Sequence, residues 1–318
     1  MLKIGYRTLK TAIGCGISIE MAQLLHLHFY TTAGIITVLS IKGTKRASLQ
    51  SAFQRFISCL LGITLAAIVF KLFPHQPIIV AALLLLFIPL VVKMKAREGV
   101  VTSSVMVVQF FSVKHITWNF IGEEIAVIVI GLGVALLLNA YMPSLEKEIV
   151  KYRLQIEKNF SVILKEFASF LREGQSDWGG HEILETEALL KEAGFLALKD
   201  EENRILREKD NYDSYFKMRG QQLEILERLM PVLSTLDETY VEGKQIGDFL
   251  ERLSQKVSPK NTADFFLEEL HKMRKSFRES ALPKDWREFE NRSALLHFTN
   301  EMERYLLLKS RLGKSYLT

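Results

Sequence analysis

Acidic residues are scarce in the first 143 positions of this 318-residue chain. Of its 36 Asp and Glu residues, only Glu20, Glu98, Glu123 and Glu124 precede residue 144, whereas 12 Lys and Arg residues do. The stretches between these charges are long and apolar, so we expect lipid to be the solvent of this part. The rest of the chain carries many charges of both signs, as a water-soluble domain does. Basic residues gathered in short loops argue against a nucleic-acid-binding face.

Cysteines and catalytic motifs are almost absent as well. Cys15 and Cys59 both lie in apolar segments and have no partner in the second half, so we expect free thiols. The chain has no phosphate-binding loop, no nucleophile elbow and no CxxC pair. His26 and His28 have no evident third ligand for a metal. We therefore expect no enzyme activity, no cofactor and no metal.

No stretch alternates polar and apolar residues as a strand does, so the predicted fold class is all-α. Spanning ~30 Å of hydrocarbon takes about 20 helical residues, so several of the apolar segments must borrow polar flanks, lie in thinned bilayer or be broken. We predict a transmembrane domain over residues 1–143, a bundle of six spanning helices at residues 5–27, 29–41, 53–73, 77–92, 99–113 and 121–141.

The charges of the loops predict the orientation of these spans. Lys and Arg favour the cytoplasmic side of a membrane. An N-terminus in the cytoplasm leaves only Lys71 and Lys114 outside and places the other loop cations inside. The same orientation puts residues 144–318 in the cytoplasm. We expect a multi-pass protein of the plasma membrane with the lipid bilayer as its surroundings.

Residues 144–318 are predicted to form a cytoplasmic bundle of about four long helices. We expect Pro231 to kink one helix, breaks at residues 242–247 and 257–262, and a capping box formed by Asp285 and Glu288. The first helix starts after Ser144 and shows one apolar stripe at spacings of three and four, which comprises Ile149, Tyr152, Ile156, Phe160, Ile163, Phe167 and Phe170.

An acidic residue interrupts the first apolar segment. Ala12, Gly16 and Glu20 are four residues apart and share a helix face. An ionised carboxylate facing lipid costs at least about 2.5–3.5 kcal/mol, so we expect Glu20 to face the bundle interior or a water-filled cavity, or to be protonated. Glu20 is therefore a candidate for proton coupling. Alternatively, it lies near the outer interface and hydrogen-bonds to another helix.

Arg55 lies at the inner end of the third apolar segment, on one face with Ser51, Ser58, Gly62 and Ala66. Small residues at spacing four allow membrane helices to approach closely, so this face is expected to point inward. Arg55 is a candidate for attracting an anion; alternatively, it extends its charge to lipid headgroups. Candidates for lining a transport path, which can instead simply bond within or between helices, are Gly16, Thr31, Thr32, Thr37, Gln54, Gly62 and Gln109.

The chain resembles the aromatic acid exporter family of bacterial membrane proteins, related to the fusaric-acid-resistance transporters. The resemblance covers essentially the whole chain. It is carried by the opening "GYRTLKTAIGCGISIEMAQLL", by "SIKGTKRASLQSAFQRFISCLLGITLAAIVF", and within that by "QRFISCLLG", which contains Gln54, Arg55 and Gly62. It implies a secondary membrane transporter for the efflux of aromatic carboxylates or similar small organic anions.

The chain departs from the larger relatives in having one set of six spans instead of two, so we expect a homodimer or higher oligomer. Our hypothesis is that Arg55 attracts the anion and Glu20 titrates during transport. The alternative is a membrane-anchored scaffold or sensor whose cytoplasmic helical bundle binds a protein partner.

Overall fold

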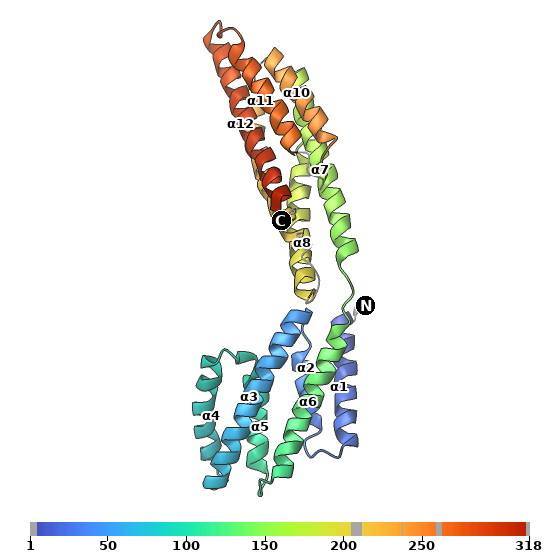
Figure 1. Ribbon diagram of the computed structural model, residues 1–318, viewed down its shortest axis with the longest axis vertical. Helices are drawn as coiled ribbons and strands as arrows, with labels where there is room; N and C mark the ends of the chain where they lie inside the picture. Colours follow the sequence, from blue (N-terminus) through green and yellow to red (C-terminus); the bar gives the residue numbers. More distant parts are fainter. Residues whose placement is uncertain (1–4, 205–211, 237, 259–262, 316–318) are drawn as a thin grey trace. The chain divides into compact units, whose positions relative to one another are not determined.

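A computed structural model describes residues 5–204, 212–236, 238–258 and 263–315 (Figure 1). Every regular element in this part of the chain is a helix, which confirms the all-α class. The chain divides into two compact units. The N-terminal unit comprises residues 1–143 with 201–207, and the C-terminal unit comprises residues 144–200 with 208–318.

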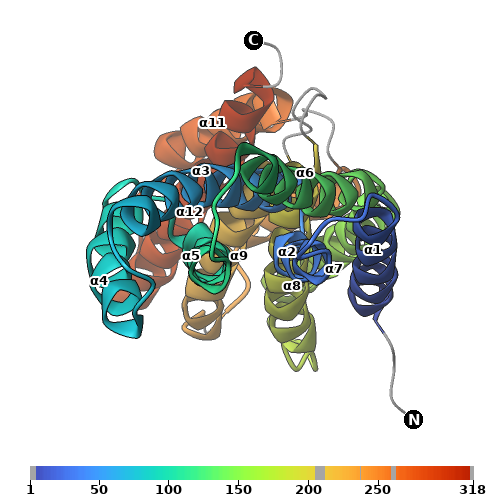
Figure 2. The same ribbon diagram turned by 90° about the horizontal axis from the view of Figure 1, so that it is seen from below.

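Helices α3 and α6 pack against each other in the N-terminal unit, α5 packs on α3, and α2 packs on α6 (Figure 2). Helix α1 packs on both α2 and α6, and α4 lies beside α5 and α3. The elements are α1 (Tyr6–Leu24), α2 (Thr31–Ser40), α3 (Lys45–Leu72), α4 (Pro77–Lys93), the 3-10 turn η1 (Arg97–Gly99), α5 (Val100–Ser112) and α6 (Trp118–Ala140).

The two longest helices of the N-terminal unit begin at threonine caps. The Thr44 side chain accepts a hydrogen bond from the Ala47 N–H, and the Thr117 side chain accepts one from the Phe120 N–H. A proline, Pro77, occupies the first turn of α4, where its missing N–H costs nothing. Thr44, Pro77 and Thr117 thus determine where α3, α4 and α6 begin.

The prediction of six spanning helices is not confirmed. Among the described helices, only α3 with 28 residues and α6 with 23 are both long and apolar enough to cross a membrane. Helix α2 has 10 residues and so extends for only about 15 Å, and α5 has 13. Six helices are present where six were predicted, but most are short or carry polar residues.

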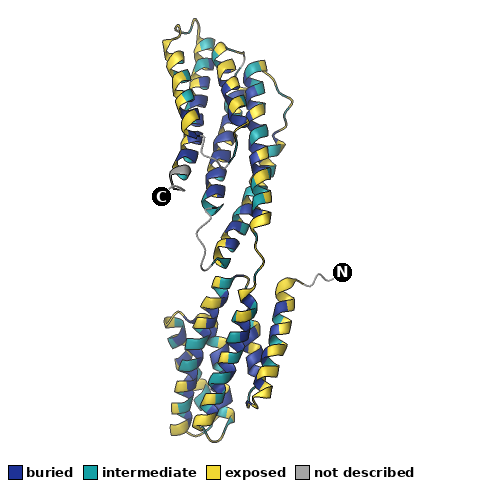
Figure 3. Ribbon diagram, turned by 45° about the vertical axis from the view of Figure 1, so that its right-hand side comes forward, coloured by how far each residue is buried: buried dark blue, intermediate teal, exposed yellow. Residues whose placement is uncertain are grey.

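In the C-terminal unit, the predicted stripe of α7 is buried at Ile149, Ile156, Phe160, Ile163 and Phe167 (Figure 3). The capping box is also present: the Glu288 N–H donates to Asp285 Oδ1 at 2.7 Å. The unit consists of α7 (Glu146–Glu173), α8 (His181–Asn203), α9 (Tyr212–Ser234), α10 (Val241–Ser254), α11 (Ala263–Glu279) and α12 (Trp286–Ser315).

The C-terminal unit has six described helices where about four long ones were predicted, and one of the additional helices is α10, because the break expected at residues 242–247 was wrong. That segment lies inside α10, whose Gly243 and Gly247 face α7. A Cβ at Gly247 would lie 2.9 Å from the Ala168 carbonyl oxygen, so glycine here permits close helix packing rather than ending a helix. Helix α9 likewise continues through Pro231 to Ser234. The second expected break, residues 257–262, falls partly outside the described residues.

Candidate functional site

Arg55 lies on the buried face of α3, as the small-residue spacing predicts. The residue is only 4% exposed. Its neighbours on this face, Ser51, Ser58, Gly62 and Ala66, are buried as well. The face therefore points into the bundle, and Arg55 does not extend to lipid headgroups.

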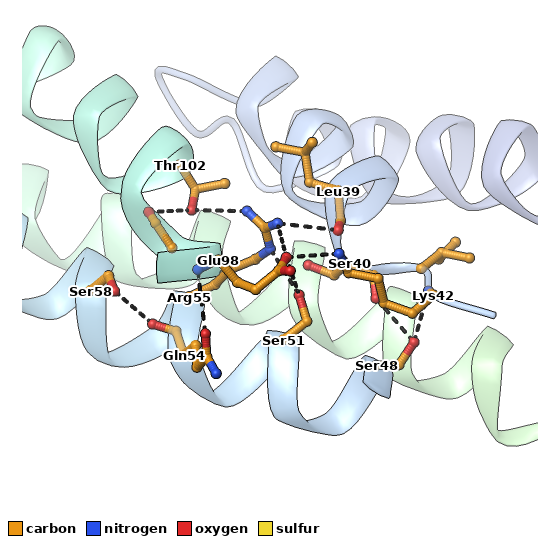
Figure 4. A network of polar contacts seen from close by, with 12 residues as sticks. Leu39, Ser40, Lys42, Ser48, Ser51, Gln54, Arg55, Ser58, Glu98 and Thr102 are labelled. Carbon is orange, nitrogen blue, oxygen red and sulfur yellow. Dashed lines mark hydrogen bonds and ion pairs between the residues drawn. The ribbon is translucent and has the colours of Figure 1, made fainter. Parts of the chain in front are cut away.

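The Arg55 guanidinium makes four hydrogen bonds, to four different elements (Figure 4). Within α3, Nε donates to Ser51 Oγ at 3.3 Å. The Nη1 atom donates to Thr102 Oγ1 of α5 at 3.4 Å. The Nη2 atom donates to the Leu39 carbonyl of α2 at 3.3 Å and to Glu98 Oε2 of η1 at 3.2 Å. Glu98 is the one carboxylate in this set.

Glu98 is brought to Arg55 by the close approach of η1 to α3. A Cβ at Gly99 would lie 2.5 Å from Ser58 Cβ and 2.8 Å from the Gln54 carbonyl oxygen, so only glycine allows this contact. The Gln54 side chain fixes the turn further, because its Oε1 accepts the Glu98 N–H at 3.3 Å. The Glu98 side chain nevertheless remains 42% exposed.

Lys42 supplies a second cation to the same carboxylate, with Nζ 2.7 Å from Glu98 Oε2. Its loop is held by Ser48, whose Oγ accepts the Lys42 N–H at 2.9 Å, and by Asn139, whose Nδ2 donates to the Thr44 carbonyl at 3.2 Å. The hydrogen bond from Lys42 lowers the pKa of the Glu98 carboxyl, outweighing its partial burial. The carboxyl is therefore ionised at neutral pH.

The cluster of Lys42, Arg55 and Glu98 thus holds one carboxylate between two cations and retains a net charge of +1. Arg55 is fixed from four sides, whereas the carboxylate comes from a short turn and is partly exposed to solvent. Such an arrangement can bind an organic anion through charge-assisted hydrogen bonds to Arg55.

Several other predicted residues point inward. Thr32 and Gln109 are buried and bonded to each other, with Gln109 Nε2 donating to Thr32 Oγ1. Thr37 Oγ1 bonds to the Ala33 and Gly131 carbonyls, each at 2.9 Å. At Gly62, a Cβ would lie 3.3 Å from the Ser103 carbonyl oxygen. These residues join helices α2, α3, α5 and α6 in the interior.

The expectation that Glu20 faces the bundle interior was wrong for a single protomer. Glu20 and Gly16 are exposed, and a Cβ at Gly16 would meet nothing within 4 Å. Helix α1 packs instead through a second stripe of small residues, Gly14, Ser18 and Ala22. A Cβ at Gly14 would lie only 2.6 Å from Leu138. Thr31 is exposed too, so it lines no route between the described helices.

The buried acid of the unit is Glu124, which sequence reasoning missed. The residue is 1% exposed, and its Oε2 has no hydrogen-bond partner among the described residues. Its spacing could have revealed it, because Glu124, Val127, Ile128 and Gly131 recur at three and four along the buried face of α6. The adjacent Glu123 differs, since its Oε2 lies 2.6 Å from His28 Nδ1 at the surface.

Comparisons with known proteins cover both units. The sequence profile of the family described as "Aromatic acid exporter family member 1" matches residues 2–142. The profile described as "Putative aromatic acid exporter C-terminal domain" matches residues 146–310.

Individual proteins are similar as well. A Bacillus subtilis (strain 168) protein described as "Uncharacterized protein YqjA" is 46% identical over 310 residues, which are 98% of this chain and 96% of the relative. A solved structure titled "Crystal structure of putative membrane protein from Clostridium difficile 630" matches 51% of this chain and 97% of its own, with 21% identity and a TM-score of 0.46.

Proposed function

Because the chain belongs to the aromatic acid exporter family, we propose that it is a secondary transporter that exports aromatic carboxylates or similar small organic anions across the plasma membrane. Its family and its two long apolar helices make it a membrane protein. The chemistry of the cluster around Arg55 supports an anionic substrate.

The single observation that carries this proposal is the buried Arg55 with a replaceable carboxylate partner. A buried guanidinium without a counter-charge is costly, so an anion beside Arg55 is favoured. Glu98 fills that role from a three-residue turn and is 42% exposed. A substrate carboxylate can take its place on Arg55 while Glu98 keeps its ion pair with Lys42. One carboxylate then replaces another on Arg55, with little net change in free energy.

Polar groups beyond Arg55 support a route through the bundle. Thr102 bonds to Arg55 and belongs to the same helix as Gln109, seven residues further along α5. Gln109 in turn bonds to Thr32. We propose that an anion entering at Arg55 passes between α2, α3 and α5, with Gln54 at the entrance and Gly62 where α3 closely approaches Ser103 of α5.

The loop charges support an orientation in which both the N-terminus and the C-terminal unit are cytoplasmic. Lys42 and Glu98, on the loops between α2 and α3 and between α4 and α5, then face the cytoplasm, where the substrate is collected. The short helices α2 and α5 require a locally thinned bilayer or cover from another copy of the chain.

We also propose that the chain works as a homodimer or higher oligomer. The face of α1 that carries Gly16 and Glu20 is exposed in the protomer although its helix lies in the membrane unit. An exposed acid against lipid is unfavourable, and a second copy packed on this face would cover it. Replacing Gly16 with Leu is expected to shift the oligomer to protomers in detergent, whereas Gly133→Leu, at another open glycine, is the matched control.

The central experiment measures efflux of ionised aromatic acids from vesicles that contain the full-length protein. Terephthalate is a suitable probe, because its two charges keep it from leaking through lipid. Arg55→Gln is expected to lower kcat/KM by about 100-fold, or about 2.7 kcal/mol, because a buried charge-assisted contact is lost. Arg97→Gln, an exposed cation on the same turn as Glu98, is the control. Equal rates for the two variants would refute the role of Arg55.

A further inference from the structure

Glu124 is a second polar site in the N-terminal unit, separate from the cluster around Arg55. It lies in the second turn of α6, at the opposite end of the helix from the Asn139 side chain that holds the Lys42 loop. The residue is 1% exposed, and its Oε2 has no hydrogen-bond partner in the described residues. A carboxylate so placed calls for an explanation.

The packing around α6 places Glu124 one turn from an aromatic cluster that adjoins the bond between Thr32 and Gln109. Phe120, one turn before Glu124, contacts Phe110, with ring centroids 4.9 Å apart, and Phe29, at 6.1 Å. Phe110 adjoins Gln109, and Phe29 precedes Thr32 by three residues. Gln109 Oε1 is also buried without a partner in this part of the chain. Two unpaired acceptors therefore lie on either side of the same aromatic cluster.

Among the described residues, no cation pairs with Glu124 from the elements packed against α6. Helix α2 has no ionisable side chain, and neither has α5. Helix α3 has cations in its first turn and an exposed Lys71 in its last turn, and its buried Arg55 is bonded to Glu98. The buried face of α1 carries Lys10, but its ammonium bonds to the Tyr141 carbonyl at the other end of α6. On α6 itself the neighbour is Glu123, a second negative charge.

A buried carboxylate without a partner is stable only if something neutralises it. With no cation facing it, the remaining means is a bound proton, which also turns one oxygen into a hydrogen-bond donor. Neither Glu124 Oε2 nor Gln109 Oε1 has a hydrogen-bond donor among the described residues. A proton on Glu124 supplies one. Polar acids inside a membrane bundle commonly serve as proton carriers.

We infer that Glu124 carries the proton that is exchanged for the exported anion. This inference rests on the proposed transport function. In each cycle a proton from the outer solution forms an O–H bond on Glu124, and that bond breaks when the proton leaves to the cytoplasm. One aromatic carboxylate leaves the cell in exchange, and no electrons are transferred.

Transport in proteoliposomes of the full-length protein tests the coupling. One coupled proton makes the accumulation of terephthalate change about tenfold per unit of imposed pH difference. This dependence is expected for the wild type and for Glu123→Gln, the adjacent acid that pairs with His28. Glu124→Gln is expected to lose it while still exchanging labelled for unlabelled terephthalate at equal pH. An unchanged pH dependence in Glu124→Gln would overturn the inference.

Infrared spectroscopy decides the role of Glu124 even if no aromatic acid is transported. The wild type and Glu123→Gln are expected to show the carbonyl stretch of a protonated carboxylic acid at neutral pH, and Glu124→Gln is expected to lack it. If Glu124→Gln does not fold, Glu124→Asp should shift the same band. Absence of the band from the wild type would overturn the inference. A band together with no transport by the wild type would instead refute the proposed function.

Discussion

Each unit of the chain buries one arginine, and the two are held in different ways. Arg55 of the N-terminal unit is 4% exposed and Arg219 of the C-terminal unit is 1% exposed. The partners of Arg55 come from four elements and include a carboxylate at 3.2 Å. Arg219 donates hydrogen bonds to two residues of its own helix, α9, and also interacts with Tyr305 of α12; none of these partners is a carboxylate.

Arg219 is enclosed by neutral groups. Its Nε donates to Tyr215 Oη at 3.0 Å, and its Nη1 donates to Gln222 Oε1 at 3.0 Å. The guanidinium also lies over the ring of Phe160, at 5.0 Å from the centroid. Burial raises the pKa of Tyr215, so its hydroxyl stays neutral and donates to Glu157 Oε1 at 2.6 Å.

The difference separates a structural arginine from one suited to a ligand. The hydrogen bonds of Arg219 to Tyr215 and Gln222 each lie within one turn of it on α9, and its ring contact comes from the buried Phe160 of α7, so these contacts form together with the core of the unit. The Glu98 contact of Arg55 comes from a short, partly exposed turn, and in the proposed function a substrate anion takes its place. Burial alone therefore does not identify a functional charge; the exposure of its partner distinguishes the two arginines.

The largest expected effect is on the stability of the C-terminal unit. Arg219→Ala should lower its free energy of unfolding by about 3–5 kcal/mol, because it leaves a cavity and breaks the buried network with Tyr215 and Gln222. Arg228→Ala, at a cation of the same helix that is 57% exposed and pairs with Glu301, should cost under about 1 kcal/mol. Thermal unfolding of the purified protein, with hydrogen exchange of α9, measures both.

An equal loss in the two variants would mean that Arg219 is no more structural than a surface cation. Arg219 would then no longer be the structural counterpart to which Arg55 is compared.

A second effect concerns pH and the neighbouring Lys309. Burial lowers the pKa of Lys309 to about 7, and the charge of Arg219 contributes in the same direction. In the unfolded chain this lysine titrates near its ordinary value, so between pH 7 and pH 9 the unfolded state binds more protons than the folded state. Stability should therefore rise with pH across this window, by up to about 1.4 kcal/mol per unit, and fall again as the pH is lowered toward 7.

Lys309→Met should flatten this slope and stabilise the unit at neutral pH, because the cost of burying the amine disappears. Chemical unfolding at pH 7, 8 and 9 measures the slope. Lys275→Met, at an exposed lysine of α11, is the matched control and should keep the wild-type slope. A slope unchanged in Lys309→Met would show that this amine is not held in its neutral form.

The sequence was sufficient for the all-α class and for the buried face of Arg55. Small residues at spacing four from Ser51 to Gly62 mark that face, and the apolar stripe of α7 marks the core of the C-terminal unit. Both are periodic along a single helix, so no knowledge of the partner is needed.

The predictions that were wrong or incomplete concern residues whose contacts are determined by tertiary packing. Helix α1 carries two stripes of small residues, and the sequence does not say that Gly14 rather than Gly16 meets α6. Glu98 was missed because a loop charge gains a partner only through the close approach that Gly99 permits. Gly247 predicts a break when considered alone, yet it meets the Ala168 carbonyl inside a helix pair. In each case the deciding contact is to a residue distant in sequence.

The smallest expected effect tests directly whether a substrate anion can replace Glu98 on Arg55. Glu98→Gln removes the internal carboxylate that competes with a substrate for Arg55, so terephthalate should bind more tightly. We expect KM for terephthalate to fall about tenfold, or about 1.4 kcal/mol, with slower turnover because the product anion is no longer displaced by Glu98. Glu123→Gln, at an acid outside the cluster, should leave KM unchanged. A higher KM in Glu98→Gln would mean that Glu98 orients Arg55 for the substrate rather than competing with it, and the contact would then be as structural as those of Arg219.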